Sequence, residues 1–191
     1  MRTVAVLFAR SDSHYKALQG TDVFDIERDA RTWRGGCPVV AHPPCRAWGK
    51  LRAFAKPRPD EKDLAFFAID QVRKFGGVLE HPVGSSLWPV AGLPRPGAVD
   101  GFGGFTLPIW QSWFGHRADK ATLLYICGVE ACEVPQMPLV LGNASHTVSP
   151  ATGRRKGTPG YRPSIRKDER EHTPVTLCAW LLEVARLSRK S

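Results

Sequence analysis

The chain has 191 residues, the length of one domain, and 42% of them are hydrophobic, which is enough to form a core without disulfides. Its formal net charge of +9 and its pI of about 9.7 favour a polyanionic partner such as DNA or RNA, with an acidic small substrate as the alternative. No apolar run approaches the roughly 18 residues that a membrane-spanning helix needs, so no membrane association is expected.

The first half of the chain has the pattern of a parallel sheet. Residues 3–8, 38–41 and 77–79 are short apolar runs, which are typical of strands covered on both faces. The apolar spacing between the last two predicts a helix over residues 60–75, with Asp60 as its N-cap and Gly76 and Gly77 at its end. We therefore expect one Rossmann-like α/β domain over residues 1–191, with a mostly parallel sheet and helices on both faces.

The second half alternates irregular and regular segments. Residues 88–110 are rich in Gly and Pro and predict an irregular excursion, whereas residues 122–127 indicate another strand. Residues 173–187 predict a closing helix, with Thr173 as its N-cap and Pro174 at its first position.

A polar, basic loop is expected over residues 142–170. Its part from Gly153 to Arg170 holds seven basic residues against two acids, which favours contact with a phosphate backbone. The alternative is a solvated loop without a partner. The basic residues are Arg154, Arg155, Lys156, Arg162, Arg166, Lys167 and Arg170.

Two segments carry the residues best suited to chemistry. The runs that end in Ala41-His42-Pro43-Pro44-Cys45 and Val78-Leu79-Glu80-His81-Pro82 each stop at a reactive side chain beside proline. Buried parallel strands would bring both side chains to the same sheet edge. We expect nearby His42 or Arg46 to favour the Cys45 thiolate, while a small buried cysteine is the alternative. An unpaired Glu80 would be costly to bury, so it either faces a cleft or forms a salt bridge.

Together these residues resemble the DNA cytosine-5 methyltransferase family. Pro43-Pro44-Cys45 matches the Pro-Pro-Cys segment whose thiol adds to C6 of the pyrimidine, and Glu80-His81-Pro82 is similar to the Glu-Asn-Val segment that holds N3 and the exocyclic amine. Residues 111–120 loosely match a later arginine segment, with Arg117 as its member. Residues 170–174 and the following helix are similar to the end of phage-type members.

The resemblance implies a DNA-modifying enzyme that acts at C5 of a pyrimidine in a bacterial cytoplasm. Cys45 would be the nucleophile, Glu80 the acid at the base edge, and Arg117 and Lys120 auxiliary cations. A duplex substrate would have to release its target base, for which Trp48, Phe102 and Trp113 are candidate wedges. The residues expected to contact the substrate are His42, Pro44, Arg46, His81, His116 and Lys120.

The methyl donor of this family is S-adenosylmethionine, but the turn that would hold it departs from the pattern. Phe8 is followed by no glycine until Gly20, although a cofactor needs close approach to the backbone there. Asp25 or Glu27 would hold a ribose hydroxyl. Two alternatives therefore stay open. One is a phage-type transferase that acts on a 5-hydroxymethyl or activated pyrimidine without S-adenosylmethionine, and the other is a non-catalytic nucleic-acid-binding derivative.

The cysteines indicate a reducing, cytoplasmic environment. There are five of them, an odd number without CxxC spacing, and the N-terminus lacks the apolar core of a signal peptide. The histidine and cysteine spacings match no standard zinc pattern, so no metal site is expected.

Overall fold

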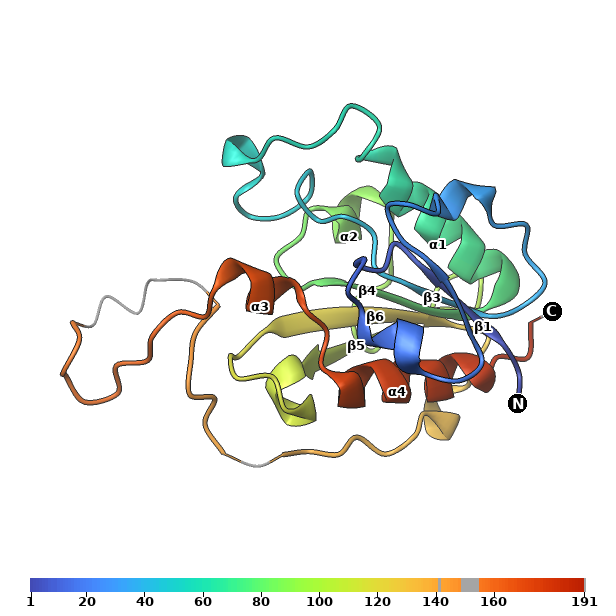
Figure 1. Cartoon of the computed structure of the whole chain (residues 1–191). Helices are drawn as coiled ribbons and strands as arrows, with labels where there is room; N and C mark the ends of the chain where they lie inside the picture. The colour runs from blue at the N-terminus through green and yellow to red at the C-terminus, as the bar shows by residue number, and fades with distance from the viewer. Residues whose placement is uncertain (141, 149–154, 191) are drawn as a thin grey trace.

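Six strands form one mixed sheet that is covered by helices on both faces (Figure 1). This computed structural model describes residues 1–140, 142–148 and 155–190. The strand order is β2-β1-β3-β4-β6-β5, which confirms the expected Rossmann-like α/β class. The strands are β1 (Val4–Leu7), β2 (Thr21–Phe24), β3 (Val39–Ala41), β4 (Gly77–Pro82), β5 (Phe105–Trp110) and β6 (Ala121–Cys127).

The parallel strands bring their carboxyl ends to one edge of the sheet. Strands β2, β1, β3 and β4 are parallel, and β6 runs antiparallel between β4 and β5. The chain passes from β1 to β2 on one side and then crosses to β3 on the other. Open α/β sheets bind ligands outside the carboxyl ends of their strands, at the point where the order reverses. Here that point lies between β1 and β3.

One helix covers each face. Helix α1 (Asp63–Phe75) packs on β3 and β4, and α4 (Val175–Arg186) packs on the opposite face against β1, β3 and β4. Helix α1 ends as predicted, because Gly76 adopts a φ of 74° and its N–H donates to the Val72 carbonyl at 2.9 Å. The predicted N-cap residues were wrong. Helix α1 begins at Asp63 rather than just after Asp60, and the Asp60 carboxylate instead accepts a hydrogen bond from Arg31 at 2.8 Å. The cap position of α4 is Pro174 rather than Thr173.

The expectation of an irregular segment over residues 88–110 was wrong for its last six residues, which form β5. Proline is tolerated at Pro108 because β5 is an edge strand and pairs only with β6. Short helical turns complete the fold. They are α2 (Leu87–Val90), α3 (Lys167–Glu171), and the 3-10 helices η1 (His14–Ala17), η2 (Ala30–Thr32), η3 (Arg52–Phe54), η4 (Gln111–Phe114) and η5 (Ala131–Glu133). Among the described residues, no helix has the length and apolar character required to span a bilayer.

Candidate active site

Cys45 and Glu80 both lie at the carboxyl edge of the parallel strands. Strands β3 and β4 pair with Ala41 opposite Leu79, so the next residues, His42 and Glu80, are level with each other. Cys45 lies in the turn after β3 and is exposed, whereas only 8% of Glu80 is exposed. The charge of Glu80 raises the pKa of the Cys45 thiol, so the two groups are electrostatically coupled.

The Glu80 carboxylate is fixed by two side-chain hydrogen bonds. His42 Nδ1 lies 3.1 Å from Oε2, and Gln111 Nε2 donates to Oε1 at 3.0 Å. The other nitrogen of His42 lies 3.0 Å from the Tyr15 hydroxyl, and Gln111 Nε2 also donates to Thr122 Oγ1 at 3.2 Å. The carboxylate is therefore held at both oxygens by groups from other elements.

These contacts determine the charge of Glu80. Burial by itself would raise its pKa, but the hydrogen bond from His42 and the positive charge of Lys120 outweigh burial and lower the pKa to about 2. Glu80 is a carboxylate at neutral pH. The expectation that it donates a proton as an acid was wrong for the free protein, in which it acts as a hydrogen-bond acceptor.

The Cys45 thiol is not activated in advance. Burial against its neighbours raises its pKa, and the charge of Glu80 raises it further, while Lys120 opposes both effects. Of the two predicted partners, Arg46 attracts the thiolate, because the charge of Cys45 contributes to the raised pKa of Arg46, whereas His42 is not among the groups that shift the pKa of Cys45. Both ring nitrogens of His42 are occupied, and the Arg46 guanidinium donates to the buried Glu61 at 2.9 Å. His42 and Arg46 therefore hold other side chains in place, and the exposed part of the Arg46 side chain remains a predicted substrate contact.

Lys120 is the cation of the site, and the role predicted for Arg117 is not supported. Lys120 directly precedes β6, whose antiparallel direction brings its first residues to the carboxyl edge of β4. Arg117 is exposed and donates to Glu169 Oε1 at 2.6 Å. Within the described part of the chain, no hydrogen bond or ion pair joins Arg117 to Cys45 or Glu80.

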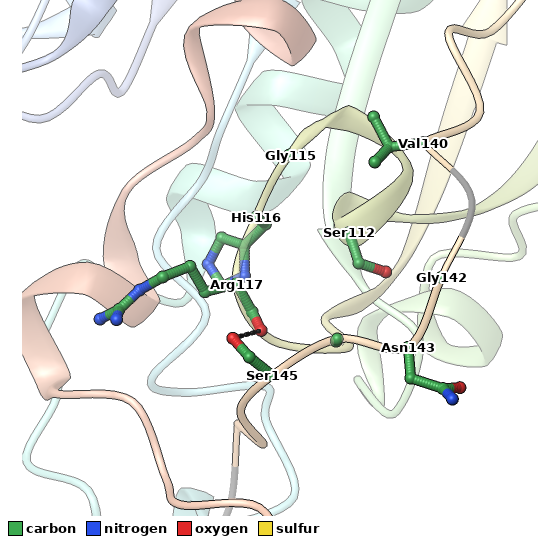
Figure 2. A pocket seen from close by; sticks show the side chains of 9 residues that line it. Ser112, Gly115, His116, Arg117, Val140, Gly142, Asn143 and Ser145 are labelled. Carbon is green, nitrogen blue, oxygen red and sulfur yellow. Dashed lines mark hydrogen bonds between the residues drawn. The ribbon is translucent and has the colours of Figure 1, made fainter.

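A shallow cavity of about 220 Å³ lies beside the loop that carries Arg117 (Figure 2). Figure 2 shows the Arg117 side chain extending away from Val140 and Asn143, which line the other side of this cavity. His116 also lines it, but only 8% of His116 is exposed and its Nδ1 contacts the Ala118 backbone at 3.0 Å. Only a small part of the His116 ring is therefore open to the substrate contact predicted for it.

His81 faces away from Glu80. Along β4, Val78 packs in the cluster under α4 and Leu79 in the cluster under α1, so alternation puts Glu80 on the first face and His81 on the second. His81 is 1% exposed, and burial lowers its pKa to about 4. The prediction that His81 contacts the substrate was wrong, because it is a neutral core residue.

A second cavity, of about 180 Å³, lies at the carboxyl ends of β1, β2 and β3, where Asp25 and Pro44 line it. The Asp25 carboxylate is already bound by Lys16 Nζ at 2.6 Å and by the backbone N–H of Glu27 at 2.9 Å. Glu27 itself is exposed and does not line the cavity.

The residues around this cavity do not fit a nucleoside-sized cofactor. Sites for molecules of that size have volumes of roughly 300–1,000 Å³, and the acceptor that a ribose hydroxyl would use is occupied. Moreover, Phe8 turns the chain after β1 with a φ of 63°, in the left-handed region where a glycine would allow close approach to the backbone. This cavity is therefore not a preformed binding site for S-adenosylmethionine.

The structure also corrects the predicted aromatic wedges. Trp48 is 2% exposed, and Trp113 packs against the core cluster that contains α4. Phe102 is 53% exposed, but its carbonyl contacts Cys127, which pairs with the first residue of β4 at the amino edge of the sheet.

The basic segment near the C-terminus is partly neutralised. Arg162 pairs with Asp119 and Arg166 with Asp168, whereas Arg155 and Lys156 are exposed without an ion pair among the described residues. The predicted contact Arg154 lies outside the described residues. Lys167 begins α3, which the sequence did not indicate.

A second basic segment, residues 46–58, follows Cys45 directly and was missed. It holds five basic residues and no acidic one, and this charge run was the signal in the sequence. No protein-family model and no curated protein matches the chain, so the functional proposal depends on these geometric observations.

Proposed function

We propose that the protein modifies C5 of a pyrimidine in DNA through a covalent bond between Cys45 and C6 of the base. One observation carries the proposal. An exposed cysteine follows β3, a carboxylate fixed at both oxygens lies in the neighbouring parallel strand β4, and the charge of Lys120 lowers the pKa of both groups. The resemblance of Pro43-Pro44-Cys45 and Glu80 to the cytosine-5 methyltransferases supports the same chemistry.

The reaction has a simple electron balance. The thiol loses its proton, its sulfur bonds to C6, and the electron pair of the C5–C6 double bond moves to C5. C5 then attacks a one-carbon electrophile, whose bond to its leaving group breaks with the electron pair going to that group, and C5 afterwards loses its own proton. The C6–S bond breaks as the double bond re-forms, and the sulfur leaves with its bonding pair. Cys45 is regenerated as a thiolate, so it acts catalytically.

Glu80 orients the base in this proposal. As a carboxylate it accepts hydrogen bonds from the donors of a pyrimidine edge, which are the 4-amino group of cytosine or the N3–H of uracil. His42 and Gln111 hold the carboxylate in one position, so the base is presented to Cys45 in one register. Lys120 stabilises the negative charge that develops as sulfur adds.

The turn after β1 favours a second form of the proposal, in which no S-adenosylmethionine is used. Phe8 stands where a glycine would allow close approach to the backbone, and the Asp25 carboxylate is already bonded to Lys16, so the cavity does not fit that donor. With a hydroxymethyl or activated group on C5, addition of sulfur at C6 would expel the leaving group with its electron pair. A nucleophile would then bond to the exocyclic carbon, and loss of sulfur would restore the ring.

A mechanism-based trap tests both forms. DNA containing a 5-fluoropyrimidine is incubated with the protein, with and without S-adenosylmethionine, and the adduct is mapped by mass spectrometry. We expect an adduct at Cys45 that disappears in Cys45→Ser and persists in Cys132→Ser, which alters the other exposed cysteine. Dependence on the donor selects methyl transfer. Absence of any adduct, or one at Cys132, would refute the proposal.

The proposed partner is DNA and the proposed compartment is the cytoplasm. Arg155 and Lys156 supply exposed charge for phosphate contacts, joined by Lys167. All five cysteines are free, which suits a reducing compartment.

A further inference from the structure

We infer that residues 46–58 form a stacking surface for single-stranded nucleic acid, on which Phe54 contacts a base neighbouring the one held at Cys45. The inference rests on the proposed function and extends it from a base to a strand. Phe54 is not among the aromatic residues that the sequence indicated, and its role follows from its exposure and its surroundings.

The segment is attached to both halves of the site. The backbone N–H groups of Trp48 and Gly49 donate to the Cys45 carbonyl at 3.0 and 2.7 Å, which fixes the turn directly after the thiol. Ser86, in the loop after β4, donates its N–H to the Trp48 carbonyl at 2.9 Å. The segment therefore begins at the thiol and is tied to the loop after β4, the strand that carries Glu80.

The base of the segment is anchored and its tip is exposed. Trp48 is 2% exposed, and its ring packs edge-on against Phe66 at a centroid distance of 5.5 Å. Further along, Leu51 is 68% exposed and Phe54 is 86% exposed. Figure 1 shows this segment, coloured cyan, projecting from the body of the molecule away from the sheet. A phenylalanine left outside the core on an anchored loop indicates a partner with a flat apolar face.

The charges around Phe54 specify the chemistry of that partner. Arg46 and Arg58 both approach the buried Glu61, but Lys50 and Lys56 have no ion pair among the described residues. The segment itself contains no acidic residue. Cations interleaved with an exposed aromatic ring match a strand of nucleic acid, which offers phosphates and base faces at alternating positions.

The test compares two exposed phenylalanines at opposite edges of the sheet. Binding of a fluorescently labelled single-stranded DNA to the full chain is measured by anisotropy for Phe54→Ala, Phe54→Trp and the matched control Phe102→Ala. We expect Phe54→Ala to weaken binding about 5- to 100-fold, which is the range for loss of one stacked base. Phe54→Trp and Phe102→Ala should both bind within about twofold of the parent. The first variant keeps an aromatic ring for stacking, and the second removes a ring that does not contact the strand. Thermal unfolding of each variant verifies the fold.

The outcomes separate this inference from the proposed function. Equal losses in Phe54→Ala and Phe102→Ala, or no loss in either, would overturn the inference and leave the Cys45 chemistry standing. A Phe54-dependent affinity without any Cys45 adduct would support the stacking inference and refute the proposed Cys45 chemistry. Concentration-dependent self-association that Phe54→Ala abolishes would assign the surface to a second copy of the chain and also overturn the inference.

Discussion

The Glu80 carboxylate is held by side chains from three different elements of the chain. His42 follows β3, Gln111 begins η4, and Lys120 precedes β6, and all of them contact or act on a group at the end of β4. Because burial alone would favour the neutral acid, the charge of Glu80 depends on these partners. The site therefore requires the complete sheet and is absent from any local fragment.

The opposing effects of Glu80 and Lys120 on Cys45 give the first prediction. Glu80→Gln removes the negative charge that raises the pKa of the thiol, so alkylation of Cys45 by iodoacetamide at pH 8 should become several-fold faster. Lys120→Met removes the opposing positive charge, so the same reaction should become slower. Mass spectrometry of the Cys45 peptide measures both rates. If both variants shift the rate in the same direction, the assigned electrostatics are wrong.

At the scale of elements, the junction between α1 and β4 depends on two consecutive glycines. Gly76 ends the helix, and Gly77 begins the strand with a φ of 118°. A Cβ on Gly77 would lie 1.9 Å from the carbonyl oxygen of Val39, within the pairing of β3 and β4. These two strands carry Cys45 and Glu80, so the junction sets the spacing of the site.

Gly77→Ala should therefore destabilise the fold by several kcal/mol, because both the left-handed φ and the backbone contact oppose a side chain. The matched control is Gly36→Ala. Gly36 also has a positive φ, of 95°, but a Cβ there meets nothing within 4 Å. We expect the control to cost only about 1 kcal/mol, from backbone strain. Urea unfolding measures both, and equal losses would show that the Val39 contact is unimportant.

The sequence predicted those elements whose local signals agree with their tertiary role. Helix α1 has apolar spacing and a glycine stop, and β3 and β4 are continuous apolar runs. Strand β5 was missed because its Pro108 is a local strand breaker, tolerated only at a sheet edge that the sequence does not reveal.

The candidate site was predictable to the same degree. Cys45 and Glu80 both come after short apolar runs, which are visible in a sequence, although β4 continues through Glu80 to Pro82. Gln111 and Tyr15 were not predictable as partners, because antiparallel β6 and the packing of η1 bring them in from distant positions. Arg117 and Lys120 were both predicted as auxiliary cations, but only the charge of Lys120 acts on Glu80, because the Arg117 side chain pairs with Glu169.

At the scale of the whole molecule, the net charge of +9 favours the proposed DNA binding, which should weaken as the salt concentration rises. Each phosphate contact to a single strand contributes a slope of about 0.7 to the fall of log K with log salt. Arg155→Gln combined with Lys156→Gln should therefore lower the slope by about 1.4. The matched control neutralises Arg34 and Lys74, which precede β3 and β4 at the opposite edge, and should leave the slope unchanged. Anisotropy titrations from low to high salt measure it, and an equal change in both double variants would place the contacts elsewhere.

The stability of the fold should also depend on pH through a residue that takes no part in the proposed reaction. His81 is almost fully buried with neither ring nitrogen bonded among the described residues, and its pKa falls from 6.5 to about 4. Between these two values the unfolded chain binds a proton that the folded protein excludes, so stability falls as the pH drops from 6.5 and the loss is complete near pH 4.

That loss amounts to roughly 3 kcal/mol, and His81→Phe should remove it by replacing the ring with one that cannot be protonated. Glu80 acts at lower pH with the same sign. Its pKa of about 2 lies below the ordinary 4.5, so its stabilisation persists above 4.5 and disappears as the pH falls towards 2. Urea unfolding from pH 7 to 4 should therefore show a flatter profile for His81→Phe than for the exposed control His14→Gln. A parent profile that is already flat across this window would mean that water or a structural rearrangement solvates the His81 ring, and that the α1 face of the sheet is less tightly sealed than its packing indicates.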